Sequence, residues 1–177
     1  PFSEAEYLSY FAAGSRARVG EKSAWYLYSR QAAAEIHRFN PDADIIVMLR
    51  NPVDMMASLH SQRLMAGAED IPDFAAALDA EEDRVRGIRL PVHLGMRDSV
   101  RYRRIARYAE QVERYLDEFG RARVHVILFD DVERDMGAVY AGTLRFLNVR
   151  DDFSPEFRVV NAGGRVASRT VARFLGH

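Results

Sequence analysis

Two short apolar runs are the clearest pattern along the chain. Ala43–Leu49 ends in five consecutive apolar residues, and Arg123–Phe129 encloses a second run. Neither alternates between apolar and polar positions, which is typical of parallel strands buried on both faces. We therefore predict two parallel strands, separated by a long stretch with helical spacing.

Amphipathic spacing predicts helices on both sides of these strands. The expected helices cover Glu4–Ala13, Ser29–Phe39, Val53–Leu64, Ile71–Arg86, Val100–Phe119, Asp135–Leu147 and a short segment from Ser168. In the fourth, Phe74, Leu78 and Val85 should face inward; the fifth is the most regular and should end at Gly120. Alternating helices and buried strands indicate an α/β fold, a parallel sheet flanked by helices in a single domain over residues 1–177. Two strands are few for such a sheet and the chain begins at Pro1, so we expect strands upstream and a sheet edge that is exposed or paired by a substitute.

Composition narrows the possible functions. The 177 residues carry a net charge of −1, which argues against bulk nucleic-acid or membrane binding, so any anion site must be local. The chain has no cysteine, which excludes disulfides and suits a reducing compartment such as the cytoplasm. No apolar run is long enough to span a membrane. The five histidines lack metal-ligand spacing, so we expect no metal.

The junction after the first strand is the first candidate site. Arg50 follows the strand directly, and Asn51-Pro52 opens the next helix. In doubly wound folds ligands bind beyond the carboxyl ends of strands, where a helix N-terminus offers unpaired N–H groups and Arg50 a donor fork for phosphate. Ser58 can add a hydroxyl donor. The alternative is that Arg50 pairs with Asp54 and Ser58 is an ordinary surface residue.

Two other segments carry candidate chemistry. Within Gly20–Leu27, Glu21 stands beside Lys22, the only lysine in the chain. A carboxylate can take a proton from an acceptor hydroxyl, and a lysine can stabilise developing negative charge. Near the C-terminus, Gly164 and Arg165 could bring backbone N–H groups and a cation to an anion. The alternative interpretation is that Glu21 and Lys22 are ordinary residues of a solvated surface, and that Gly164 and Arg165 belong to a simple loop.

In order, these motifs resemble the sulfotransferase superfamily, above all its bacterial and heparan sulfate-modifying domains. The chain has Gly20-Glu21-Lys22-Ser23-Ala24-Trp25-Tyr26 for the family's Gly-Glu-Lys-Ser/Thr-Pro-x-Tyr. After an apolar strand it has Arg50-Asn51-Pro52-Val53-Asp54-Met55-Met56-Ala57-Ser58 for the family's Arg-Asn/Asp-Pro-Val-x-Arg-x-x-Ser. Segments resembling a long helix and a later strand-helix pair follow at 107–116, 126–132 and 144–149.

The resemblance implies a P-loop-NTPase-like fold and sulfuryl transfer from 3′-phosphoadenosine 5′-phosphosulfate, without a metal, to a small-molecule or glycan acceptor. It implies that Arg50 and Ser58 hold the 3′-phosphate, that Gly164 and Arg165 close over it, and that Glu21 is the general base beside Lys22. If Glu21 is not the base, His60 is the next candidate.

The sequence departs from the family pattern in three places. Met55 replaces a common arginine, Ala24 replaces a common proline, and the N-terminal phosphosulfate loop is not in the chain. Because the lysine of that loop normally stabilises the leaving phosphate, we expect it upstream of Pro1, and this chain alone could be inactive. A P-loop-type nucleotide kinase and a non-catalytic nucleotide-binding or scaffold module of the same fold remain the alternatives.

Overall fold

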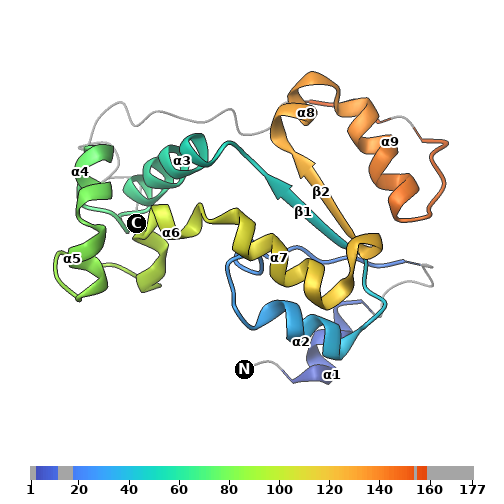
Figure 1. The fold of residues 1–177 in the computed structure, drawn as a ribbon, viewed down its shortest axis with the longest axis horizontal. Coiled ribbons are helices and arrows are strands. Elements are labelled where there is room, and N and C mark those ends of the chain that lie inside the picture. Colours follow the sequence, from blue (N-terminus) through green and yellow to red (C-terminus); the bar gives the residue numbers. More distant parts are fainter. Residues whose placement is uncertain (1–2, 12–17, 154, 159–177) are drawn as a thin grey trace.

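The fold is known from a computed structural model that describes residues 3–11, 18–153 and 155–158. Short helices surround two strands in these residues (Figure 1). In chain order the elements are α1 Glu4–Ser9, α2 Ala32–Phe39, β1 Ile45–Leu49, α3 Pro52–Met65, α4 Phe74–Asp79, α5 Glu81–Val85, the 3-10 turn Arg97–Val100, α6 Tyr102–Ile105, α7 Tyr108–Phe119, the 3-10 turn Arg121–Arg123, β2 Val124–Leu128, α8 Phe129–Arg134 and α9 Met136–Phe146.

The two predicted strands form one parallel sheet, which confirms the predicted α/β fold. Ile45 of β1 pairs with Val124 of β2, and the register continues without a bulge to Leu49 and Leu128. Both strands run toward α3 and α8, so their carboxyl ends lie side by side at the same end of the sheet (Figure 1). Within the described residues each strand has one strand partner, so the sheet has two strands there.

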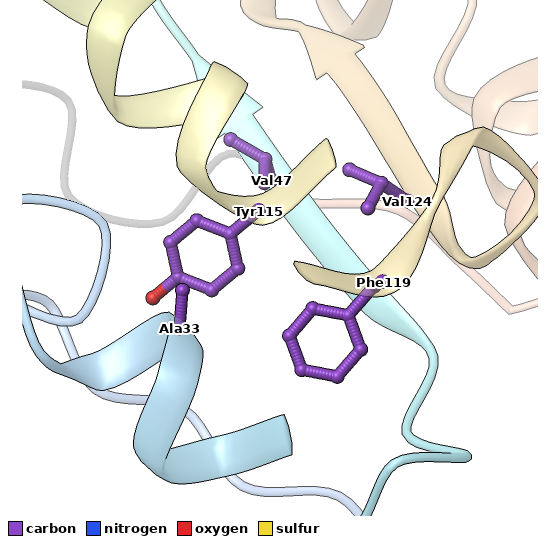
Figure 2. Close-up of a cluster of buried hydrophobic side chains, with 5 residues drawn as sticks. All are labelled: Ala33, Val47, Tyr115, Phe119 and Val124. Carbon is purple, nitrogen blue, oxygen red and sulfur yellow. The ribbon is translucent and has the colours of Figure 1, made fainter. Parts of the chain in front are cut away.

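Helices α2 and α7 cover one face of the sheet and form the main core with it. Val47 and Val124 come from the adjacent strands, Tyr115 and Phe119 from α7, and Ala33 from α2 (Figure 2). Each of these side chains is buried, and burying a large apolar side chain stabilises a fold by about 1.5–3 kcal/mol. This core therefore fixes α7 against the strands whose ends carry the predicted site.

A second core lies beyond the strand ends, among α3 to α6. Val100 and Tyr102 are completely buried, and Met56 and Leu59 of α3 pack against them. Helix α3 is thus held along one side by apolar contacts, which leaves another side for the site.

Two predicted helices are each broken into two. The Ile71–Arg86 segment divides at Ala80 into α4 and α5, and Val85, which should face inward, is 59% exposed. The Val100–Phe119 segment divides into α6 and α7 because Arg107 leaves the helical conformation, with ψ at 62°. The buried Gln111 side chain donates to the Ile105 carbonyl at 2.9 Å, so it satisfies a backbone group that the break releases.

The remaining helices lie close to their predicted positions. Helices α1, α2, α3 and α9 fall within or near the expected ranges, whereas the short helix α8 was not predicted. Gly120 ends α7 with a φ of 73°, a backbone conformation that favours glycine. The helix expected from Ser168 lies outside the described residues. Of the helices described, none is long and apolar enough to cross a membrane.

Candidate anion-binding site

Arg50 lies where the carboxyl ends of the two strands meet. It follows β1, and its guanidinium carbon is 5.2 Å from the centre of the Phe129 ring, which follows β2. Tyr108, the first residue of α7, is also close: burial raises the pKa of its hydroxyl, and the positive charge of Arg50 opposes that rise. An aromatic ring therefore holds Arg50 at the carboxyl ends of the strands, where we predicted that a ligand binds.

No carboxylate neutralises Arg50 in the described part of the chain. The alternative pairing with Asp54 does not occur, since the ion pairs among residues 3–11, 18–153 and 155–158 do not include Arg50. Its contact with Phe129 is a cation–π interaction, worth about 0.5–1 kcal/mol at an exposed position. The guanidinium donors therefore remain available for an anion.

Arg50 and Ser58 line the same hollow, as the break between strand and helix at Asn51-Pro52 led us to expect. The hollow has a volume of about 220 Å³, and its other lining residues are Met55, Leu59 and Gln62. The four residues from α3 lie on one face of the helix, because Ser58 and Leu59 are each three or four positions from both Met55 and Gln62. A guanidinium, a hydroxyl and an amide thus converge on a space large enough for a phosphate group.

The N-terminus of α3 differs from the prediction, because its N–H groups are not free. The Asn51 side chain accepts from Val53 N at 2.9 Å and from Asp54 N at 3.4 Å, and Met55 N donates to the Asn51 carbonyl. Pro52 has no N–H to offer. The expectation of unpaired N–H groups was wrong, since the N-cap residue satisfies them itself. Anion binding here depends on side chains.

Glu21 and Lys22 are exposed, and Glu21 interacts with Tyr26 and Tyr7. Burial and the nearby Glu21 carboxylate raise the pKa of Tyr26 to about 12, and the same two causes raise the pKa of Tyr7 in α1. The contacts found between described residues do not join Glu21 or Lys22 directly to Arg50 or Ser58. Their roles in catalysis remain predictions.

The residues after Lys22 nevertheless connect to both helices of the site. The guanidinium carbon of Arg63, on α3, lies 5.6 Å from the centre of the Trp25 ring. The Tyr115 hydroxyl on α7 donates to the Tyr26 carbonyl at 2.8 Å, and Arg114 donates to the Leu27 carbonyl at 3.0 Å. Residues 25–27, which shortly follow Glu21 and Lys22, are therefore anchored to the helix that carries Ser58 and to the helix that begins beside Arg50.

His60, the reserve candidate for the base, has a structural position. Its side chain is 3% exposed, its Nε2 lies 2.9 Å from the Ile71 carbonyl, and its ring packs against Phe74 and Tyr102. A carbonyl only accepts, so Nε2 is the donor and is not free to take a proton. Gly164 and Arg165 lie outside the described residues. Within the described residues, no cluster of three histidine or acidic side chains could hold a metal ion.

A larger hollow of about 330 Å³ lies between β2, α8 and α9. Its charged lining residues include Asp131, Arg134 and Asp135, and Arg134 pairs with Asp131 at 2.7 Å. Because its arginine is neutralised and two carboxylates face it, this hollow is less suited to an anion than the one beside Arg50.

Three polar or aromatic residues of the site were not predicted from the sequence: Phe129, Tyr108 and Gln62. The rule that ligands bind beyond strand ends could have found Phe129, since it directly follows the second strand. The helical spacing from Ser58 could have found Gln62, one turn later. Tyr108 had no such signal, because its position depends on the break before α7.

Among the described residues, Arg50 has no carboxylate partner at the ends of the parallel strands, so the site suits an anionic group in an α/β protein. Residues 32–157 match the sulfotransferase domain model, so the chain belongs to the sulfotransferase domain family. The crystal structure of a sulfotransferase from Alicyclobacillus acidocaldarius is similar, with a TM-score of 0.76 and 36% identity, over 87% of this chain. The match covers 60% of that chain. Among curated proteins, none matches the sequence.

Proposed function

We propose that this chain is part of a sulfotransferase that moves a sulfuryl group from 3′-phosphoadenosine 5′-phosphosulfate to a hydroxyl or amine. The observation that carries the proposal is the hollow shared by Arg50 and Ser58, in which the guanidinium lacks a carboxylate partner among the described residues. Membership of the sulfotransferase domain family supports this choice of reaction. A small-molecule or glycan acceptor and a cytoplasmic location complete the proposal.

The residues of the hollow suit the 3′-phosphate of the donor. Arg50 can place two parallel N–H groups on phosphate oxygens, a geometry that a guanidinium provides and an ammonium does not. The Ser58 hydroxyl, on a shorter side chain of α3, adds an uncharged hydrogen-bond donor. A bound phosphate would also give Arg50 the counter-charge that the described residues do not supply.

The protein has little covalent chemistry to perform in the transfer step. The donor supplies an activated sulfuryl group whose S–O bond to phosphate breaks as a new S–O or S–N bond forms to the acceptor. Glu21 accepts the proton that the acceptor loses, and Lys22 stabilises negative charge nearby. The adjacent segment, anchored to α3 and α7 through Trp25, Tyr26 and Leu27, would hold that carboxylate in position.

Replacing Arg50 tests the proposal most directly. Losing a charged hydrogen bond costs about 1.5–3 kcal/mol, so Arg50→Ala should weaken 3′-phosphoadenosine 5′-phosphate binding by about 10- to 100-fold. Isothermal titration calorimetry on the full-length protein measures this, and Arg145→Ala, at an exposed arginine of α9, is the control. Unchanged affinity in Arg50→Ala would refute the assignment of this hollow to the 3′-phosphate.

A further inference from the structure

Arg63 is an arginine whose surroundings the proposed reaction leaves unexplained. It lies on α3, next to Gln62 of the hollow, and its guanidinium stacks over Trp25 at 5.6 Å. Its Nε is buried without a hydrogen-bond partner, and within the described residues the guanidinium forms no ion pair. Buried donors are nearly always satisfied, so one that is not points to a missing acceptor.

Two other arginines show which contacts a guanidinium with a structural role makes in this protein. Arg114 also has a buried Nε without a partner, but its terminal nitrogens donate to the carbonyls of Glu110 and Leu27. Arg84 is fully buried and forms two hydrogen bonds with the Glu69 carboxylate. Arg63 has neither arrangement: apart from its cation–π contact with Trp25, its guanidinium has no partner among the described residues.

The residues around Arg63 add positive charge. The Trp25 and Tyr28 rings meet edge to face at 5.8 Å, and the guanidinium of Arg104 lies over Tyr28 at the same distance. Asp98, the acid of this group, already accepts from the Tyr28 hydroxyl at 2.7 Å and from Arg101 at 2.9 Å. With three arginines to one engaged carboxylate, the group has a net positive charge and two aromatic rings.

We propose that Arg63 and Trp25 form a subsite for an anionic group of the acceptor, such as a carboxylate, sulfate or phosphate. The inference rests on the proposed function, which places the Glu21–Trp25 segment beside the acceptor. Arg63 acts as a specificity residue: it binds the acceptor's anion and does not take part in the transfer. The enzyme would thereby select acidic acceptors over neutral ones of similar shape.

Trp25 provides a local probe, because it is the only tryptophan in the sequence and Arg63 covers its ring. Inorganic sulfate titrated into the 177-residue chain should change Trp25 fluorescence saturably. Arg63→Met keeps an unbranched side chain against the ring but removes the charge, and it should weaken sulfate binding by about 10-fold or more. Arg63→Lys should retain part of the affinity, and Arg145→Met, on α9, should match the unmodified protein.

Binding of 3′-phosphoadenosine 5′-phosphate separates this inference from the proposed function. Arg63→Met should leave that affinity within about threefold, and Arg50→Ala should leave the sulfate response of Trp25 intact. The inference is overturned if sulfate gives no saturable response, if Arg63→Met responds as the unmodified protein does, or if that variant loses donor binding about tenfold. Failure of Arg50→Ala to weaken donor binding would count against the proposed function alone.

Discussion

Arg50 and Arg84 belong to two regions that use the same side chain in opposite ways. Arg84 is completely buried among α4 to α6, where Glu69 accepts two of its hydrogen bonds at 2.8 and 2.6 Å and Tyr102 donates to the same carboxylate. Arg50 lies exposed at the strand ends, against the Phe129 ring and, in the part of the chain that the structure describes, without a carboxylate partner. Arginine count or position alone therefore says little about function in this chain.

The difference also separates what each region should contribute. A buried ion pair is held in place by the fold, and removing one partner leaves the charge of the other partner buried and uncompensated. An unpaired charge beside a hollow contributes little to folding and is available to a ligand. We therefore expect changes at the strand ends and the Glu21 segment to affect binding or rate, and changes in the Glu69–Arg84 pair to affect stability.

The largest effect should come from the general base. Glu21→Gln removes the proton acceptor, and losing such a group typically lowers turnover by about 10²–10⁴-fold. Because the donor is held elsewhere, affinity for 3′-phosphoadenosine 5′-phosphate should stay within a few-fold. Steady-state turnover and calorimetry on the full-length enzyme measure the two quantities. The exposed Glu113→Gln on α7 is the control.

A Glu21→Gln enzyme with near-normal turnover would show that another residue is the base. His60 would be poorly placed to replace it, because its ring is buried and its Nε2 is engaged with the Ile71 carbonyl. The comparison between unpaired and paired charges would then hold for donor binding but not for the chemical step.

Breaking the buried pair should instead cost stability. Arg84→Met leaves the Glu69 carboxylate buried without its cation, and such a loss destabilises a protein by about 3–5 kcal/mol. Urea unfolding followed by circular dichroism measures the change. Arg50→Met, which removes an exposed arginine, should change the free energy of unfolding by less than about 0.5 kcal/mol. If both variants lose similar stability, Arg50 is a structural residue and the contrast between the two regions fails.

The two regions also differ in how far the sequence predicted them. Arg50 and Ser58 could be assigned to one site because the break from a buried strand to a Pro-initiated helix is a local pattern, and because the segment resembles a family motif. The Glu69–Arg84 pair joins two positions that are 15 residues apart in the sequence. The hydropathy pattern instead predicted that Val85 faces inward, whereas Val85 is exposed. A buried charge whose partner is distant in sequence has no local signature.

The broken helix before α7 has the same explanation. Apolar residues keep helical spacing from Ile105 to Phe119, so periodicity predicts one continuous helix. The break depends on Arg107 and on the hydrogen bond from Gln111 to the Ile105 carbonyl, and neither residue type is a helix breaker. Tyr108 reaches Arg50 only after this change of direction, which is why it could not be assigned to the site in advance.

Acid should weaken the paired region in a defined direction. Burial alone would raise the pKa of Glu69, but hydrogen bonds from Arg84, the Ile71 N–H and Tyr102 outweigh it and hold the pKa below its ordinary value. The unfolded chain then binds this proton more readily than the folded one. The stability that Glu69 contributes is present above the unfolded pKa of about 4.3 and is lost as pH falls through the folded value.

Urea unfolding between pH 7 and pH 3 measures this contribution. Glu69→Gln cannot titrate, so its stability should fall less steeply below about pH 4.3, by up to about 1.4 kcal/mol per pH unit. The exposed Glu133→Gln on α8 should follow the unmodified protein. Parallel curves for Glu69→Gln and the unmodified protein would show that the pair does not shift this carboxyl's titration.

The smallest expected effect compares two serines on one helix. Ser58 lines the hollow with Arg50, whereas the Ser61 hydroxyl donates to the Ala57 carbonyl at 3.1 Å and is satisfied within α3. A neutral hydrogen bond contributes about 0.5–1.5 kcal/mol, so Ser58→Ala should weaken 3′-phosphoadenosine 5′-phosphate binding by about two- to tenfold. Ser61→Ala should leave that affinity unchanged, because its hydroxyl is already bonded to its own helix. Calorimetry on both variants decides the matter: equal affinities would mean that Arg50 holds the phosphate without Ser58, and that one face of α3 serves as a wall and not as a donor.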